Sequence, residues 1–276
     1  MAFIQAQFLS KVLNLCVSVN VILPAANIRA QQREIPVVYL LHGYSDDHTM
    51  WMRRTSIERY AETIAPEFAI VMPAIDHSFY TDMKRGNKYW TFVSQELPEL
   101  LGSMFPLSNK REDTFTTGLS MGGYGCLKLA LNQPERFLAV ASMSGACDMS
   151  WQIKNTTDNH QLDAEIINVF GTLDEFSGSV NDLAHAAEVV AKGSVQPNIR
   201  LACGTKDFLY DNNVAFHNHL TKLGLPVVWE ATPDRAHTWD YWDEQVQESL
   251  RWFVELRNKA KAGSASGETI LKAAVY

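Results

Sequence analysis

Residues 114–125 are Thr114-Phe115-Thr116-Thr117-Gly118-Leu119-Ser120-Met121-Gly122-Gly123-Tyr124-Gly125. The first of them are β-branched or aromatic, which favours a strand, and residues 126–131 have a helical pattern that ends before Pro134. A strand, a sharp turn and a helix are the context in which Gly-x-Ser-x-Gly forms a nucleophile elbow. Side chains at Gly118 and Gly122 would clash with the backbone in so tight a turn. The sequence therefore predicts that Ser120 presents its hydroxyl above the end of a sheet.

A glycine-rich turn without a nucleophile, or a phosphate loop, is the alternative interpretation of this stretch. No Gly-Lys-Ser/Thr follows the glycines, which excludes a Walker loop, and no third glycine stands at the spacing of a dinucleotide fingerprint. The nucleophile interpretation is favoured, and the rest of the chain supports it.

Strands and helices alternate along the chain on both sides of this turn. Residues 35–41 and 68–73 are continuous apolar runs, as expected of strands buried on both faces. Residues 3–9 and 16–23 resemble strands and are joined by a short turn, which predicts an antiparallel pair. Further strands are expected at 137–145, 198–204 and 226–230, and helices at 57–64, 92–105, 182–190, 214–223 and 243–259. This order predicts an α/β three-layer sandwich with a mostly parallel central sheet and an antiparallel N-terminal strand pair.

The domain organisation follows from the same pattern. Residues 1–259 are expected to form a single domain. Residues 149–180 have weaker periodicity and are rich in Gly, Asn, Thr and Asp, which predicts a small insertion or cap over the sheet edge. Residues 260–276 are rich in Ala, Gly, Ser and Lys and are expected to be a flexible tail or to dock on a neighbour.

A serine hydroxyl needs a neighbouring base, and that base needs a carboxylate to orient it. The strand at 198–204 leads into Asp207, and the strand at 226–230 leads into His237, so Ser120, Asp207 and His237 follow three strands in the order Ser, Asp, His. Asp211 is a less favoured alternative, because it lies a turn into the following helix, and Asp148 follows the wrong strand. We predict a catalytic triad of Ser120, Asp207 and His237.

Other histidines are weaker candidates for the base. His217 and His219 lie inside a predicted helix, where surface or packing roles are more common, and His42 ends a strand, where a structural hydrogen bond within its loop is favoured.

The developing oxyanion needs two N–H donors. Met121, directly after the nucleophile, supplies one, and Tyr44 is expected to supply the other, with Gly43 permitting close approach.

Composition bounds the remaining function classes. The net charge is −7 and 46% of the residues are hydrophobic, which argues against nucleic acid or an anionic membrane as the main partner and favours a large core. The four cysteines have no paired or metal-ligand spacing, so free thiols, no metal and no cofactor are expected. The N-terminus lacks a basic segment and an uninterrupted apolar run, so a cytoplasmic location is the default. A homo-oligomer is compatible with the sequence.

The motifs together resemble the tributyrin esterase branch of the esterase D family, within the α/β-hydrolase superfamily. The resemblance covers residues 1–258 and rests on Tyr39-Leu40-Leu41-His42-Gly43-Tyr44-Ser45, Trp51, Tyr80-Thr81-Asp82, Glu96-Leu97-Pro98, the Gly118–Gly125 stretch, Asp207-Phe208-Leu209-Tyr210 and residues 237–242. It implies an α/β-hydrolase fold, a triad at Ser120, Asp207 and His237, and an oxyanion hole at the loop of residues 42–44 and at Met121. The activity implied is hydrolysis of short-chain acyl esters, a small-molecule substrate.

Related branches widen the functional alternatives. They include S-formylglutathione hydrolases, acetyl and feruloyl esterases acting on carbohydrate-linked esters, and mycolyltransferases. Five aromatic residues, which are expected either near the mouth of the site or in the core, are candidates for stacking on a sugar or phenolic ring: Tyr44, Trp51, Tyr80, Trp90 and Trp239. A silent binding scaffold is the alternative from another class, and the intact triad argues against it.

Overall fold

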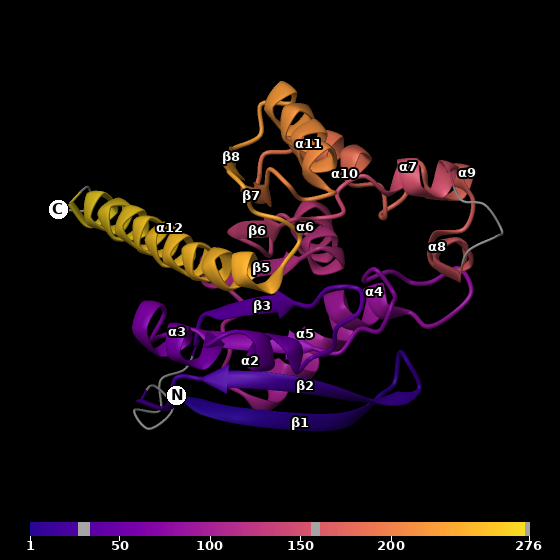
Figure 1. The fold of residues 1–276 in the computed structure, drawn as a ribbon. Coiled ribbons are helices and arrows are strands. Elements are labelled where there is room, and N and C mark those ends of the chain that lie inside the picture. The colour runs from indigo at the N-terminus through magenta and orange to yellow at the C-terminus, as the bar shows by residue number, and fades with distance from the viewer. Residues whose placement is uncertain (27–33, 156–160, 274–276) are drawn as a thin grey trace.

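A single sheet of eight strands, in the order β1-β2-β4-β3-β5-β6-β7-β8, forms the centre of the structure (Figure 1). The computed structural model describes residues 1–26, 34–155 and 161–273. The strands are β1 (Ala2–Ser10), β2 (Leu15–Leu23), β3 (Val37–Leu41), β4 (Ala69–Pro73), β5 (Thr114–Leu119), β6 (Ala139–Met143), β7 (Asn198–Gly204) and β8 (Val227–Thr232). β1 pairs antiparallel with β2, and β2 with β4, whereas the strands from β4 to β8 are parallel.

Helices cover both faces of this sheet. They are α2 (Met50–Arg54), α3 (Ile57–Ile64), α4 (Tyr89–Thr91), α5 (Leu97–Met104), α6 (Met121–Asn132), α7 (Met149–Lys154), α8 (Gln161–Phe170), α9 (Leu173–Phe176), α10 (Leu183–Ala191), α11 (Tyr210–Lys222) and α12 (Trp239–Ala273). Side chains of α5, α6, α10 and α11 belong to one buried cluster, and those of α2, α3 and α12 to another. The predicted fold class, an α/β sandwich with an antiparallel N-terminal pair and an insertion, is confirmed.

The alternation of side chains in β3 shows why its apolar run is continuous. Val37, Tyr39 and Leu41 pack in the first cluster, and Val38 and Leu40 pack in the second. Successive side chains of a strand point to opposite faces. A central strand covered on both faces therefore needs apolar residues at every position.

Three helices differ from the predicted boundaries. The predicted helix at 92–105 is a π-helical turn, Phe92–Glu96, that continues directly into α5. Pro98 lies in the first turn of α5 and has no N–H to donate, and the Ser94 carbonyl, four residues earlier, accepts a hydrogen bond from Arg136 at 2.8 Å instead. Helix α11 begins four residues earlier than predicted. Helix α12 begins at Trp239, four residues earlier than predicted, and continues to Ala273, beyond the predicted end at residue 259. The tail is rich in Ala and Lys, which favour a helix, and residues 274–276 lie outside the described residues.

The insertion at 149–180 contains α7, α8 and α9. Figure 1 shows these helices grouped at one end of the molecule, far from the C-terminal end of α12. Helices α7 and α8 contribute to the wall of the cavity described below.

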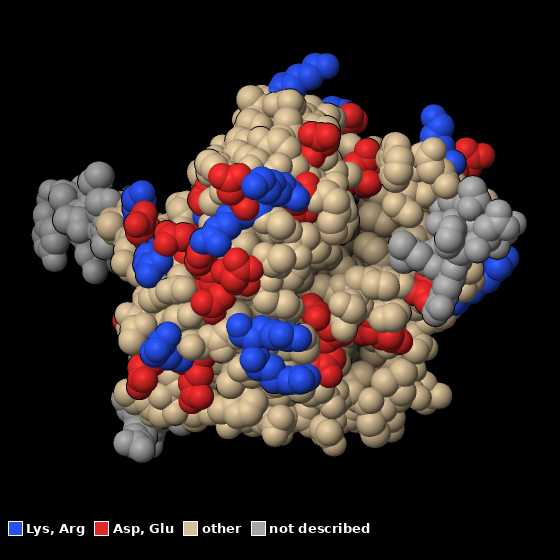
Figure 2. Space-filling model, viewed as in Figure 1, with Lys and Arg blue, Asp and Glu red and all other residues tan. Residues whose placement is uncertain are grey.

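In Figure 2, Lys and Arg side chains are mixed with Asp and Glu over the visible face, without a continuous basic surface. Within the described ranges, no helix is at once long and apolar enough to span a bilayer.

Candidate active site

Ser120 occupies a strained turn between β5 and α6. Its backbone has φ 52° and ψ −115°, a conformation that residues other than glycine rarely adopt. A Cβ at Gly122 would lie 2.5 Å from the Leu41 carbonyl oxygen, and one at Gly118 would lie 2.6 Å from the Gly122 carbonyl oxygen, so both glycines are required. The Ser120 N–H donates to the Met143 carbonyl at 3.0 Å and anchors the turn to β6. The predicted elbow therefore exists, and Ser120 is half-buried at its apex.

Asp207 and His237 form a hydrogen-bonded pair. The Nδ1 atom of His237 lies 2.9 and 3.0 Å from the two carboxylate oxygens of Asp207. Burial by itself raises the pKa of Asp207. Hydrogen bonds from His237, from the Leu209 N–H (2.8 Å) and from the Ser144 side chain outweigh it and hold the pKa below its ordinary value. An ionised Asp207 fixes the proton of His237 on Nδ1, which leaves Nε2 as the basic nitrogen.

Two aromatic rings hold the imidazole of His237. The Phe208 ring lies 4.5 Å from it, and the Trp242 ring lies 4.8 Å away in an edge-on arrangement. The Trp242 Nε1–H donates to the Ser144 hydroxyl at 3.1 Å, which fixes the indole in turn. The histidine is therefore restrained on two sides as well as by its carboxylate.

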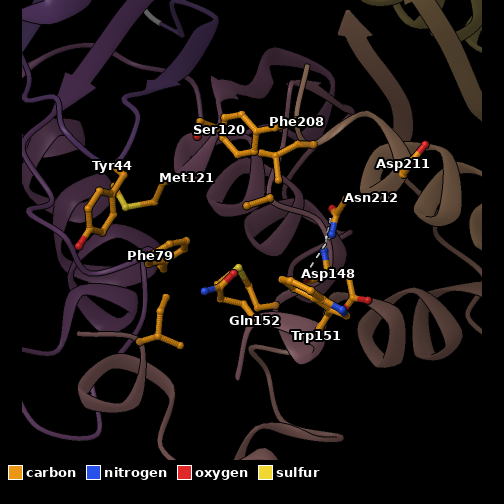
Figure 3. A pocket seen from close by; sticks show the side chains of 14 residues that line it. Tyr44, Phe79, Ser120, Met121, Asp148, Trp151, Gln152, Phe208, Asp211 and Asn212 are labelled. Carbon is orange, nitrogen blue, oxygen red and sulfur yellow. Dashed lines mark hydrogen bonds between the residues drawn. The ribbon is translucent and has the colours of Figure 1, made fainter. Parts of the chain in front are cut away.

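A cavity of about 770 Å³ opens in front of Ser120 (Figure 3). Phe208, whose ring is tilted against that of His237, also lines this cavity, so it connects the Asp207–His237 pair to the cavity of the serine. The lining residues come from the loops after β3, β4, β6 and β7, from the turn after β5, and from α6, α7, α8 and α11. They are Tyr44, Phe79, Ser120, Met121, Ala146, Asp148, Met149, Trp151, Gln152, Ile166, Phe208, Leu209, Asp211 and Asn212.

The predicted oxyanion donors lie together in this cavity. Tyr44 and Met121 both line it, and Figure 3 shows them side by side. Met121 is the first residue of α6, so its N–H has no partner within the helix. In the described part of the chain, neither the Tyr44 nor the Met121 N–H has a hydrogen-bond partner. Gly43 differs, because its N–H donates to Asp46 at 3.1 Å and is not available as a donor.

Hydrogen bonds of buried polar groups fix the loop that contains Tyr44. Ile75 donates its N–H to His42 Nε2 at 3.1 Å, and His42 Nδ1 lies 2.8 Å from the Gly43 carbonyl. Burial lowers the pKa of His42 to about 4, so the ring is neutral at physiological pH. The hydroxyl of Tyr80 donates to the His42 carbonyl at 2.9 Å. His42 is thus a structural residue, as predicted.

Of the five aromatic residues expected as candidates for substrate stacking, Tyr44 lines the cavity and the other four do not. Trp51 and Tyr80 are 0% exposed, which rules out contact with a substrate in this structure. Trp51 donates its Nε1–H to the Leu41 carbonyl at 3.1 Å, a packing role in the core.

Trp90 and Trp239 are half-buried and also have structural neighbours. The Trp90 ring lies 4.8 Å below the buried ammonium group of Lys128, which binds the Tyr80 carbonyl at 2.9 Å. Trp239 packs edge-on against Trp51 at 5.1 Å. The residue type alone does not distinguish aromatic side chains in the core from aromatic side chains that line the cavity.

The remaining alternatives are placed by the structure. His217 and His219 lie in α11, where His217 stacks on Trp229 and His219 Nε2 lies 3.2 Å from the Ala184 carbonyl, and neither lines the cavity. Asp211 lies in the first turn of α11 and lines the cavity, while Asp207 holds the histidine.

The sequence did not predict Phe208, Trp151 and Phe79 as cavity residues. Only Phe208 carried a signal, because it directly follows Asp207. Among the residues described, no three His, Cys, Asp or Glu side chains are grouped as a metal site requires.

The sheet order, the strained serine elbow after β5 and an Asp–His pair on the loops after β7 and β8 are the features of an α/β hydrolase. The chain belongs to the esterase family whose model is described as "Putative esterase", which matches residues 10–253. It is a carboxylic ester hydrolase.

Named relatives agree with this assignment. The chain is 31% identical to an acetyl esterase of Caldicellulosiruptor saccharolyticus, over 93% of this chain and 99% of the relative. It is similar to FphF, a fluorophosphonate-binding serine hydrolase of Staphylococcus aureus, with a TM-score of 0.82 and 31% identity over 92% of this chain and 98% of that one. It is also similar to the S-formylglutathione hydrolase FrmB of Staphylococcus aureus, with a TM-score of 0.80 and 32% identity over the same shares.

Proposed function

We propose that the protein is a serine esterase that hydrolyses short-chain acyl esters through an acyl-enzyme on Ser120, with His237 as base and Asp207 as its orienting carboxylate. The observation that carries the proposal is the Asp207–His237 pair, joined through Phe208 to the cavity of Ser120. The relative named acetyl esterase supports a small acyl group. The motifs shared with tributyrin esterases support the same range.

In the first half of the reaction, Ser120 Oγ attacks the ester carbonyl carbon and its proton passes to His237 Nε2. The carbonyl oxygen becomes an oxyanion that accepts hydrogen bonds from the Tyr44 and Met121 N–H groups. The C–O bond to the alcohol then breaks, and the alcohol leaves with the proton from His237. Asp207 stays ionised and stabilises the imidazolium.

In the second half, water replaces the alcohol. His237 Nε2 takes a proton from the water as its oxygen attacks the acyl carbon, and the same two N–H groups stabilise the second oxyanion. The bond to Ser120 Oγ breaks, the serine regains its proton from His237, and a carboxylic acid leaves. Each proton is returned within the cycle, so the residues named suffice for it.

The test is a rate series on p-nitrophenyl esters from acetate to octanoate, with methyl ferulate, for the wild type and Ser120→Ala. We expect kcat to fall on the order of 10⁴- to 10⁶-fold in Ser120→Ala and wild-type rates to peak at acyl chains of two to four carbons. Ser103→Ala, at an exposed serine of α5, is the matched control and should keep full activity. Equal rates for wild type and Ser120→Ala would overturn the proposal, and a preference for ferulate would replace the short-chain substrate by a plant-wall ester.

A further inference from the structure

The cavity has two chemically different sides. Tyr44, Phe79 and Met121 lie on one side of Ser120, and Asp148, Trp151 and Asp211 lie on the other (Figure 3). The first side is mainly apolar. The second side combines two carboxylates with an indole that is 64% exposed and with the amide of Asn212.

The charges on this second side have one sign. Among the described residues that line the cavity, none is Lys, Arg or His, and the two carboxylates of Asp148 and Asp211 are the charged groups. Neither is in an ion pair with a described residue. Asp148 is the N-cap of α7 and accepts hydrogen bonds from the Ser150 N–H at 2.9 Å and from the Ser150 hydroxyl, which orient its carboxylate without supplying a cation.

We infer that Asp148 and Asp211 are specificity-determining residues that select esters with a neutral or cationic alcohol and reject those with an anionic alcohol or thiol. The inference rests on the proposed function, because it concerns the group that leaves from the acyl-enzyme at Ser120. This selection against anionic leaving groups would distinguish the protein from enzymes whose substrates have carboxylates on the thiol that leaves, as S-formylglutathione does.

The magnitude follows from the size of the cavity. A cavity of about 770 Å³ is roughly one Debye length across, on the order of 10 Å at 0.1 M salt, so an anion bound inside it is not fully screened from either carboxylate. Two partly exposed charges at such distances change kcat/KM on the order of five- to ten-fold for a substrate with one charge. The two carboxylates repel an anionic alcohol group both in the bound substrate and in the transition state.

The experiment compares three acetate esters that differ mainly in charge: 3-acetoxybenzamide, 3-acetoxybenzoate and 3-acetoxy-N,N,N-trimethylanilinium. Each kcat/KM is divided by the rate constant for hydroxide-catalysed hydrolysis, which removes differences in intrinsic reactivity. At low ionic strength we expect the normalised value for the benzoate to be at least five-fold below that for the benzamide and the value for the anilinium to be above it. The differences should shrink in 0.5 M NaCl, because salt screens charges and does not change steric fit.

Two variants assign the effect to the residues. Asp148→Asn keeps an N-cap side chain for α7, and Asp211→Asn keeps the size of the side chain at the start of α11. Each should raise the ratio of kcat/KM for the benzoate to that for the benzamide about three-fold, and the double variant should abolish the discrimination. Glu58→Gln removes an exposed carboxylate from α3, outside the cavity, and should leave all ratios unchanged.

The outcomes separate the two proposals. Ser120-dependent hydrolysis of the benzamide with equal normalised values for the benzoate would overturn the charge selection and leave the esterase proposal intact. Discrimination that persists in Asp148→Asn and Asp211→Asn, or that does not respond to salt, would overturn the assignment to these carboxylates. Absence of Ser120-dependent hydrolysis of the benzamide would overturn the esterase proposal itself.

Discussion

The hydroxyl of Tyr44 donates a hydrogen bond to the carboxylate of Glu165, and this contact joins the loop after β3 to helix α8. His77 stacks on the Tyr44 ring at 4.2 Å, and its Nδ1 lies 3.3 Å from the same carboxylate. The residue proposed to stabilise the oxyanion through its backbone is thus held by its side chain against the insertion.

Replacement of Tyr44 by Phe should therefore loosen an oxyanion donor without removing it. We expect kcat on p-nitrophenyl acetate to fall on the order of ten-fold with little change in KM, less than the loss of an entire donor. Glu165→Gln keeps an oxygen acceptor and should cost less than Tyr44→Phe. Steady-state kinetics of both variants give the answer, and a Tyr44→Phe enzyme with wild-type kcat would show that this contact does not position the donor.

Gly122→Ala should disrupt the site through the backbone. The added Cβ would lie 2.5 Å from the Leu41 carbonyl oxygen and 2.7 Å from that of His42, so α6 and the loop that carries Tyr44 must move apart. We expect kcat to fall at least about 100-fold, as for loss of an oxyanion donor, together with a lower free energy of unfolding. Gly102→Ala is the control: it lies in α5 with open space around its Cβ and should stabilise the protein by about 0.5–1 kcal/mol.

Protonation of His42 should destabilise the fold in acid. Burial lowers its pKa from 6.5 to about 4, so between these values the unfolded chain binds a proton that the folded protein does not. Stability from this residue is complete above pH 6.5 and decreases as the pH falls toward 4, by about 3 kcal/mol. Asp207, whose pKa is lowered, loses its contribution only below its ordinary value of 3.8.

Chemical denaturation at several pH values, for the wild type and His42→Gln, tests this prediction. Glutamine does not titrate and can accept the Ile75 N–H, which donates to His42 Nε2 in the wild type. The free energy of unfolding of the variant should depend less steeply on pH between 6.5 and 4. Parallel curves for the two proteins would contradict the assignment.

A buried ion pair far from the active site should control stability without affecting catalysis. The Nε atom of Arg257 in α12 lies 2.6 Å from the carboxylate of Asp113, and the side chains are 4% and 7% exposed. Arg257→Met also breaks the pair of Arg257 with Glu67 and leaves the buried Asp113 carboxylate with the Ser108 hydroxyl but without a cation, which should cost about 3–5 kcal/mol of unfolding free energy. Arg251→Met, which breaks an exposed pair with Glu248 on the same helix, should cost less than about 1 kcal/mol.

Thermal unfolding and kcat on p-nitrophenyl acetate distinguish these effects. The Tm of Arg257→Met should fall clearly, and its kcat at 20 °C should match that of the wild type. A Tm equal to that of Arg251→Met would mean that the Arg257–Asp113 pair adds nothing.

The sequence by itself determined the sheet, the serine elbow and the order of Ser120, Asp207 and His237, because these are local properties. Apolar alternation marks each strand, and each of the three residues follows a strand within a few positions, so parallel topology brings them to one edge. The Asp207–His237 contact then follows from the pairing of β7 with β8.

Tertiary structure alone decided what surrounds the serine. Trp51 and Trp151 both lie within short helices, yet one is 0% and the other 64% exposed, because exposure depends on which elements pack over a residue and not on its neighbours in sequence. Tyr44 meets Glu165 across 121 residues, and Arg257 meets Asp113 across 144. Such contacts form only after the chain has folded, since no local pattern encodes the distance between segments so far apart.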